Sequence, residues 1–236
     1  MPRTAPPADD AVPRVREVHR RLRKRFGPLD PPVRREPLEE LILTVLSQNT
    51  SDLNRDRAFA AMRARFPSWE DVAEAPETDL EAAIRPGGLS RIKAARILAI
   101  LEEIRQREGG SLSLGWMEKA TSARVAKYLL SLPGVGPKTV ACVLGFSLGR
   151  PALPVDTHVY RVALRLAFIP GTADPIRAHA LLEGLVPARL RVSMHVGMIR
   201  LGRQICRAGR PRCEICPVQD LCPTAPLVLS GRRWSG

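Results

Sequence analysis

Long apolar runs are missing from this sequence of 236 residues. No stretch approaches the roughly 18 apolar residues that a membrane-spanning helix needs. The first residues, MPRTAPPADDAVPRVREV, hold no apolar signal core, which argues against secretion. Alternating polar and apolar residues, the pattern of half-buried strands, are nearly absent too. The sequence therefore predicts an all-α fold, no membrane segment and a location in the cytoplasm.

Lysine is also scarce, although the chain is strongly basic. The 37 lysine and arginine residues outnumber the 24 acidic ones and give a formal net charge of +13. Such a charge indicates a polyanionic partner, of which nucleic acid is the first candidate, and a solvated basic surface is the alternative. Arginine cannot act as an amine nucleophile at neutral pH. That role would fall to one of five residues: Lys24, Lys93, Lys119, Lys127 and Lys138.

Helical periodicity runs through most of the chain. Residues 1–12 are expected to be disordered, and residues 226–236 are expected to form a loose basic tail. Between them the pattern predicts helices over residues 15–27, 38–47, 53–66, 68–75, 77–84, 91–109, 122–132, 137–149, 156–168, 175–186 and 191–206. The helix over 38–47 is so apolar that we expect it to be buried.

Two of these helices are joined by the stretch LPGVGPKT, residues 132–139. The N–H groups of Gly134, Gly136 and the first turn of the next helix lack helical acceptors, and glycine lets a ligand approach the backbone closely. Such a turn can bind an anion, here a DNA phosphate, with Lys138 directly beside it. The turn alone is equally compatible with a plain helical corner.

Four of the five cysteines lie between residues 206 and 222 with the spacing C-x6-C-x2-C-x5-C. Nothing indicates an oxidising compartment, so a metal site is expected rather than disulfides. The single C-x2-C pair and the two Cys-Pro steps favour an iron–sulfur cluster over zinc, which remains the alternative. The metal would stiffen a basic loop between the first two ligands and present Arg207, Arg210 and Arg212 to phosphate. The fifth cysteine, Cys142, reads as a small core residue.

Asp156, in LPVDTHVYRV, precedes an apolar helical run and is expected to cap that helix. A functional role would need Asp156 to face Lys138 across a cleft. The sequence alone does not decide between the two roles.

Together, LPGVGPKT, VDTH and the cysteine spacing resemble the endonuclease III family, the helix–hairpin–helix DNA glycosylases with an iron–sulfur cluster. The resemblance extends from about residue 37 to residue 223. It implies a six-helix barrel domain and a cluster domain on either side of a DNA-binding cleft. Residues 1–29 would form a basic N-terminal segment that packs with the cluster domain. The barrel would cover residues 30–150, with the hairpin at 122–148. The cluster domain would cover residues 151–225, followed by a basic tail at 226–236.

The resemblance also implies a function. Lys138 matches the family's catalytic lysine and Asp156 its catalytic aspartate, while Cys206, Cys213, Cys216 and Cys222 match the ligands of a [4Fe-4S] cluster. The implied enzyme is a monomeric bifunctional DNA glycosylase and AP lyase on the nucleoid, which acts on double-stranded DNA with damaged bases or abasic sites. It would remove oxidised pyrimidines through a lysine Schiff base and cleave the 3′ side by β-elimination. The alternatives are a monofunctional mismatch glycosylase of the same superfamily and a DNA-binding module without catalysis.

Other matches are less specific. Leu89 aligns with a leucine that the family wedges into DNA, and the family's usual glutamine is replaced by Asn49, with Gln48 one step earlier. His158 is a candidate phosphate contact or a structural histidine, and His195 is expected to be structural. The remaining residues expected at the DNA are those of the hairpin, namely Gly134, Val135, Gly136 and Thr139.

Overall fold

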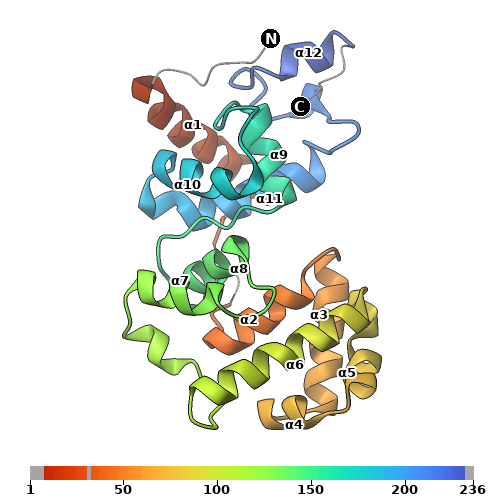
Figure 1. Cartoon of the computed structure of the whole chain (residues 1–236). Coiled ribbons are helices and arrows are strands. Elements are labelled where there is room, and N and C mark those ends of the chain that lie inside the picture. Colours follow the sequence, from red (N-terminus) through yellow and green to blue (C-terminus); the bar gives the residue numbers. More distant parts are fainter. Residues whose placement is uncertain (1–7, 31–32, 232–236) are drawn as a thin grey trace. The chain divides into compact units, whose positions relative to one another are not determined.

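The computed structural model describes residues 8–30 and 33–231, and every regular element in these ranges is helical (Figure 1). The predicted all-α fold is confirmed. Within the described ranges, no helix is long and apolar enough to cross a membrane. The chain divides into two compact units, one formed by residues 34–150 and the other by residues 1–33 together with 151–236.

The unit of residues 34–150 begins with the apolar helix α2, Pro37–Leu46, whose Pro37 fits the first helical turn. Helix α3 starts at a serine cap, and α4 starts at a capping box formed by Ser68 and Asp71. The remaining helices of this unit are α3 (Asp52–Arg65), α4 (Trp69–Glu74), α5 (Glu77–Ile84), α6 (Ser90–Arg107), α7 (Ser122–Leu130) and α8 (Pro137–Cys142).

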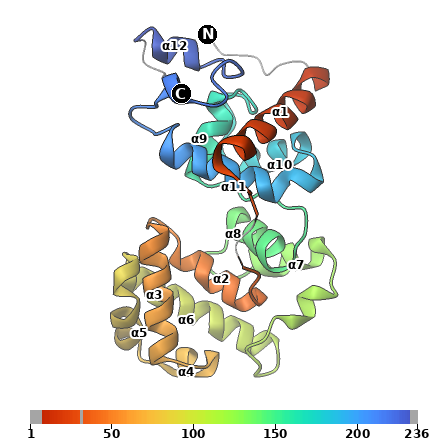
Figure 2. The same ribbon diagram turned by 180° about the vertical axis from the view of Figure 1, so that it is seen from behind.

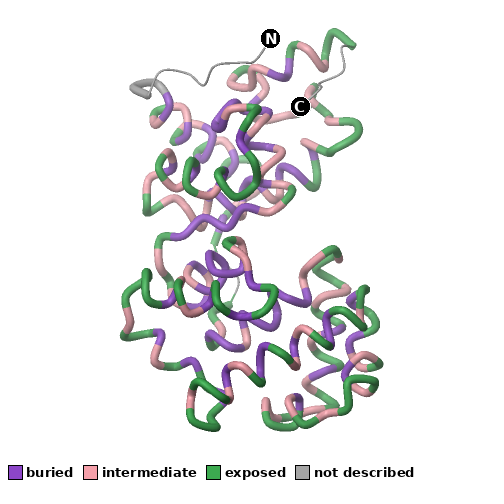
Figure 3. The backbone as a smooth tube through the Cα atoms, in the orientation of Figure 1, coloured by how far each residue is buried: buried purple, intermediate pink, exposed green. Residues whose placement is uncertain are grey.

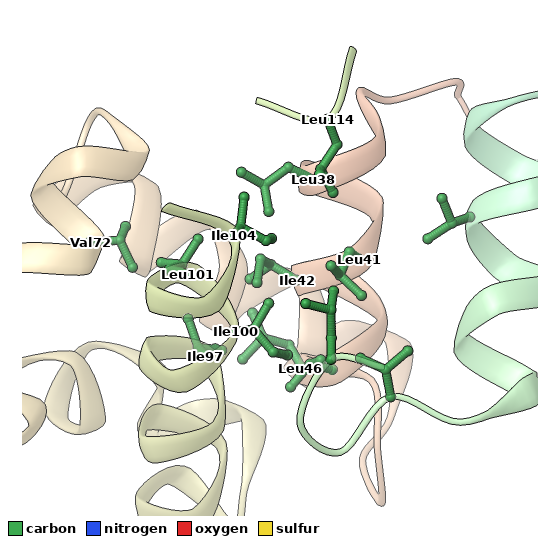
Figure 4. Packing of buried hydrophobic residues seen from close by; sticks show 14 of the residues in the cluster. Leu38, Leu41, Ile42, Leu46, Val72, Ile97, Ile100, Leu101, Ile104 and Leu114 are labelled. Atoms are coloured by element: carbon green, nitrogen blue, oxygen red, sulfur yellow. The ribbon is translucent and has the colours of Figure 1, made fainter. Parts of the chain in front are cut away.

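The core of this unit lies mainly between α2 and α6. Leucine and isoleucine side chains three and four residues apart point from each helix toward the other, and both rows are fully or almost fully buried. Figure 4 shows this contact, with Leu38, Leu41, Ile42 and Leu46 on α2 and Ile97, Ile100, Leu101 and Ile104 on α6. Burial of so many aliphatic side chains fixes α2, and with it the loop that follows at residue 47.

The second unit joins the two ends of the sequence. Helix α1 (Ala8–Phe26) packs beside α10 (Pro175–Leu185) and α11 (Arg191–Gln204), as both views show (Figures 1 and 2). Helix α9 (Thr157–Arg165) also packs on α11. Val15, Val18 and Leu22 give α1 one buried face, and buried, intermediate and exposed residues follow one another along the helix (Figure 3).

Two predicted boundaries were wrong. Helix α1 starts at Ala8, inside the segment expected to be disordered, because Pro13 removes only one backbone hydrogen bond near the start of the helix. Residues 225–229 form the short helix α12, although the tail was expected to begin at 226. Residues 143–147 continue α8 as a π-helical turn. The predictions for residues 1–7 and 232–236 lie outside the described residues.

Candidate functional site

The hairpin between α7 and α8 is built by backbone conformation. Gly134 has φ of +70°, a value that favours glycine, whereas Gly136 is extended and precedes Pro137 at the start of α8. The N–H of Val135, between the two glycines, donates to the Leu132 carbonyl over 3.2 Å and is not available to an anion. In the described part of the chain the N–H groups of Gly134 and Gly136 have no such acceptor. The side chains of Val135 and Thr139 are buried.

Arg96, on α6, fills the space above Gly134. A Cβ atom at residue 134 would lie 2.3 Å from Arg96 Nε. Arg96 Nη1 donates to Gln48 Oε1 over 2.6 Å, so one guanidinium connects the hairpin to the loop after α2. The sequence interpretation missed Arg96, because an arginine in a helical pattern normally indicates a solvated face.

Lys138 is the second residue of α8, and its side chain is partly exposed. Lys138 Nζ donates to Ser47 Oγ over 3.5 Å, and Ser47 Oγ in turn donates to the Thr44 carbonyl over 2.7 Å. Ser47 is the C-cap residue of α2. The amine is therefore held at the carbonyl end of a buried helix, where the helix dipole favours positive charge.

Two loops of this unit contain residues in the left-handed region. Asn49 has φ of +51° and Leu89 has φ of +50°, and Leu89 is 51% exposed. Lys93 lies beneath both loops at 2% exposure, and its Nζ donates to the carbonyls of Leu46 (2.7 Å) and Gly87 (2.8 Å). Burial lowers the pKa of Lys93. This buried lysine, which the sequence interpretation did not single out, holds the two loops in place and helps to retain their strained residues.

Asp156 lies in the other unit, at the N-terminus of α9. Its Oδ1 accepts a hydrogen bond from the Val159 N–H over 2.8 Å, which confirms the predicted N-cap. That Asp156 also faces Lys138 stays a prediction.

The two histidines have different environments. His158 Nδ1 lies 3.1 Å from Arg161 Nη2, and burial lowers the pKa of His158. His195 is buried and its Nδ1 donates to the Pro154 carbonyl over 2.7 Å, as expected of a structural histidine. His158 is thus held by an arginine of its own helix, and its contact with phosphate stays a prediction.

The four clustered cysteines also belong to this second unit. Burial, followed by the charges of neighbouring thiolates, raises the pKa of Cys213, and burial raises the pKa of Cys216 to about 12. The pKa of Cys222 is raised by burial as well. Thiols that repel each other as thiolates fit a cationic group bound among them.

The structure gives two observations on the space around the cysteines. In the described ranges, no three His, Cys, Asp or Glu side chains converge on a point that would hold one ion. Four thiolates around one zinc ion would lie about 4 Å from each other. A cavity of about 380 Å³ opens beside Cys216 and Cys222. The cavity is lined by these two cysteines together with Gln219, Asp220, Ala225, Pro226 and Leu229.

Arg165, on α9, organises the cysteine segment. It is 5% exposed, and its guanidinium donates to Cys206 Sγ (3.3 Å) and to the carbonyls of Arg207 (2.7 Å) and Ala208 (2.9 Å). Its own carbonyl accepts from Cys222 Sγ (3.3 Å) and Thr224 Oγ1 (2.8 Å). One residue thus binds both ends of the segment, and no local sequence signal indicated it. The side chains of Arg207, Arg210 and Arg212 are exposed, as presentation to phosphate requires.

Comparisons with known proteins agree with this geometry. Residues 42–188 match the HhH-GPD superfamily of base excision DNA repair proteins, and residues 206–222 match the iron–sulfur binding domain of endonuclease III. Endonuclease III of Thermotoga maritima is 34% identical over 210 residues, which are 88% of this chain and 92% of that protein. A putative DNA glycosylase of Arabidopsis thaliana is 38% identical over 191 residues, which are 79% of this chain and 64% of the plant protein.

Solved structures show the same relationship. A trapped covalent intermediate of endonuclease III with DNA matches with a TM-score of 0.80 and 29% identity, over 92% of this chain and 98% of that one. A thermostable thymine-DNA glycosylase shares the fold, with a TM-score of 0.71 and 22% identity. The cysteine segment is therefore an iron–sulfur domain that takes a [4Fe-4S] cluster. With the hairpin domain and this segment both matched, the chain belongs to the endonuclease III family of HhH-GPD base excision repair glycosylases.

Proposed function

We propose that this enzyme is a bifunctional DNA glycosylase and AP lyase that removes oxidised pyrimidines from double-stranded DNA. The observation that carries the proposal is the position of Lys138. Its amine stands at the start of α8, directly after the glycine hairpin, and is held at the C-terminus of α2. An amine in this place can act on a sugar whose phosphate is bound by the hairpin backbone.

The chemistry begins with a nucleotide flipped out of the duplex, because a stacked base cannot be reached. The neutral amine of Lys138 attacks C1′, the bond from C1′ to the base breaks, and the base leaves with a proton. Breaking of the bond between C1′ and the ring oxygen then opens the sugar and gives a Schiff base, which permits β-elimination on the 3′ side. Asp156 would stabilise positive charge that develops on the sugar.

The two loops tied by Lys93 are proposed to enter the duplex at the lesion. Leu89 is an exposed apolar side chain on a strained backbone, and a wedge between stacked bases requires such a residue. Asn49 and Gln48 would lie by the unpaired base. Since Arg96 already binds the Gln48 amide oxygen, we assign the direct contact to Asn49.

The cluster is proposed to be held by Cys206, Cys213, Cys216 and Cys222. When bound, it supplies the metal–thiolate bonds that fix the segment. Arg207, Arg210 and Arg212 would then meet the DNA backbone as a preformed group. The enzyme is also proposed to associate with the nucleoid, where its substrate lies.

Borohydride trapping tests the proposal. DNA containing thymine glycol or an abasic site should give a covalent adduct with the wild-type enzyme, and Lys138→Gln should give none while it keeps its affinity for DNA. Lys127→Gln is the matched control, since Lys127 is an exposed lysine on the preceding helix. Base release without an adduct would indicate a monofunctional glycosylase, and neither base release nor an adduct would indicate a binding module.

A further inference from the structure

Arg96, in the second turn of α6, is a cation without an acid beside it. In the described ranges of the chain no carboxylate pairs with Arg96, and its one hydrogen-bond partner is Gln48, whose Oε1 accepts from Nη1 over 2.6 Å. Arg96 is partly exposed, so it is neither a fully solvated surface charge nor one half of a buried ion pair. A guanidinium has five N–H donors, and only one of them is needed for this amide oxygen. Charge balance therefore does not explain why an arginine stands here.

The same side chain packs on the hairpin. A Cβ atom at residue 134 would lie 2.7 Å from Arg96 Cδ and 2.9 Å from Arg96 Cζ, so Arg96 lies directly against the hairpin backbone. Gly134, whose φ is +70°, leaves the space that the arginine fills. One side chain thus contacts the hairpin along its length and the loop after α2 at its tip. The spacing between hairpin and loop follows from the reach of Arg96.

The loop of residues 47–51 carries an exposed amide next to a fixed one. Ser51 caps α3 at one end of the loop, and Gln48 is bound by Arg96 near the other. Between them, Asn49 is exposed and has φ of +51°, and its side chain makes no hydrogen bond to another described residue. A residue in the left-handed region keeps that conformation only while its surroundings hold it there. The position of the Asn49 amide therefore depends on the bond between Gln48 and Arg96.

We propose that Arg96 is a positioning residue for recognition of the undamaged strand, which holds Asn49 at the distance from the hairpin where its amide meets the unpaired base. This inference rests on the proposed function, in which Asn49 meets that base and the hairpin binds the backbone of the damaged strand. A hydrogen bond to a base edge weakens within a few tenths of an ångström and with a poor angle, whereas phosphate contacts carry no sequence information. Arg96 therefore controls which base is accepted opposite the lesion.

Binding of DNA that carries a tetrahydrofuran analogue of an abasic site, placed opposite each of the four bases in turn, tests this role. The analogue has no base to lose and forms no Schiff base, so the measurement does not need the chemistry of Lys138. The readout is the ratio between the Kd of the weakest duplex and the Kd of the tightest one. Loss of a cation weakens binding to all four duplexes alike, so this ratio separates positioning from charge.

Three variants and one control address the bond between Arg96 and Gln48. Arg96→Met keeps a long side chain on the hairpin but has no donor, and Gln48→Leu removes the acceptor while the cation stays. Arg96→Lys keeps the charge and a donor. Arg105→Met is the matched control, because Arg105 is also partly exposed and lies nine residues later on the same helix, about 14 Å away.

We expect Arg96→Met and Gln48→Leu each to lower the ratio about fivefold, and the double variant to lower it no further, because both changes remove the same hydrogen bond. Arg96→Lys should restore part of the ratio, and Arg105→Met should keep the wild-type value. A wild-type ratio in folded Gln48→Leu, additive effects in the double variant, or equal binding of the four duplexes by the wild-type enzyme would overturn the inference. Absence of a borohydride adduct with abasic DNA would refute the proposed lyase instead, so the two failures are distinguishable.

Discussion

Replacing Glu40 by glutamine should stabilise the protein at alkaline pH and much less at acidic pH. Burial raises the pKa of Glu40 from 4.5 to about 7. Between these values the folded state binds more protons than the unfolded state, so the free energy of unfolding falls as the pH rises. A shift of about 2.5 units corresponds to about 3 kcal/mol in full. About 2.5 kcal/mol of it should be lost between pH 5 and pH 8.

Urea unfolding of wild type, Glu40→Gln and Glu39→Gln at pH 5 and pH 8 measures this difference. Glu40→Gln should gain about 2.5 kcal/mol on wild type between the two pH values, because glutamine carries no charge to bury. Glu39→Gln removes the same formal charge from a more exposed position and should keep the wild-type dependence. An offset between Glu40→Gln and wild type that does not change with pH would refute the reasoning that burial controls this carboxyl group.

Other expected outcomes concern the hairpin, the cap, the cysteine segment and the DNA. Gly134→Ala should lower the free energy of unfolding by about 1–2 kcal/mol, because φ at residue 134 is positive and Arg96 must move. Gly136→Ala should lower it much less in the same urea titration, because a Cβ atom at residue 136 has no neighbour within 4 Å. Asp156→Asn should keep the stability but lose most turnover, whereas Asp156→Ala should also lose about 1 kcal/mol with the cap. Arg165→Gln should lower the iron and labile sulfide per polypeptide, and unchanged iron would contradict its role in the segment. The logarithm of the binding constant for undamaged DNA should fall linearly with the logarithm of the salt concentration. The expected fall is about 0.9 log units for each phosphate contact per tenfold increase in salt, and a flat response would contradict phosphate binding.

Local patterns predicted the helices and the three motifs well, because periodicity, caps and cysteine spacing depend on neighbours in sequence. Lys93, Arg96 and Arg165 escaped prediction for the opposite reason. Each satisfies carbonyl or amide oxygens in other elements, and only the packed fold creates those contacts. Glu40 escaped too, since one carboxylate in an apolar helix does not alter the periodicity that identified α2 as buried.

The replacement of the family's usual glutamine by Asn49 also has a reason in the backbone. Residue 49 has φ of +51°, and asparagine enters the left-handed region more readily than most residues with a side chain. The side chain of Gln48, one step earlier, is already bound within the protein, because Arg96 donates a hydrogen bond to its amide oxygen. The loop therefore combines an exposed short amide at 49 with a fixed longer amide at 48. A shorter amide reaches less far than glutamine would, so the proposed contact of Asn49 with the unpaired base requires Arg96 to hold this loop close to the hairpin.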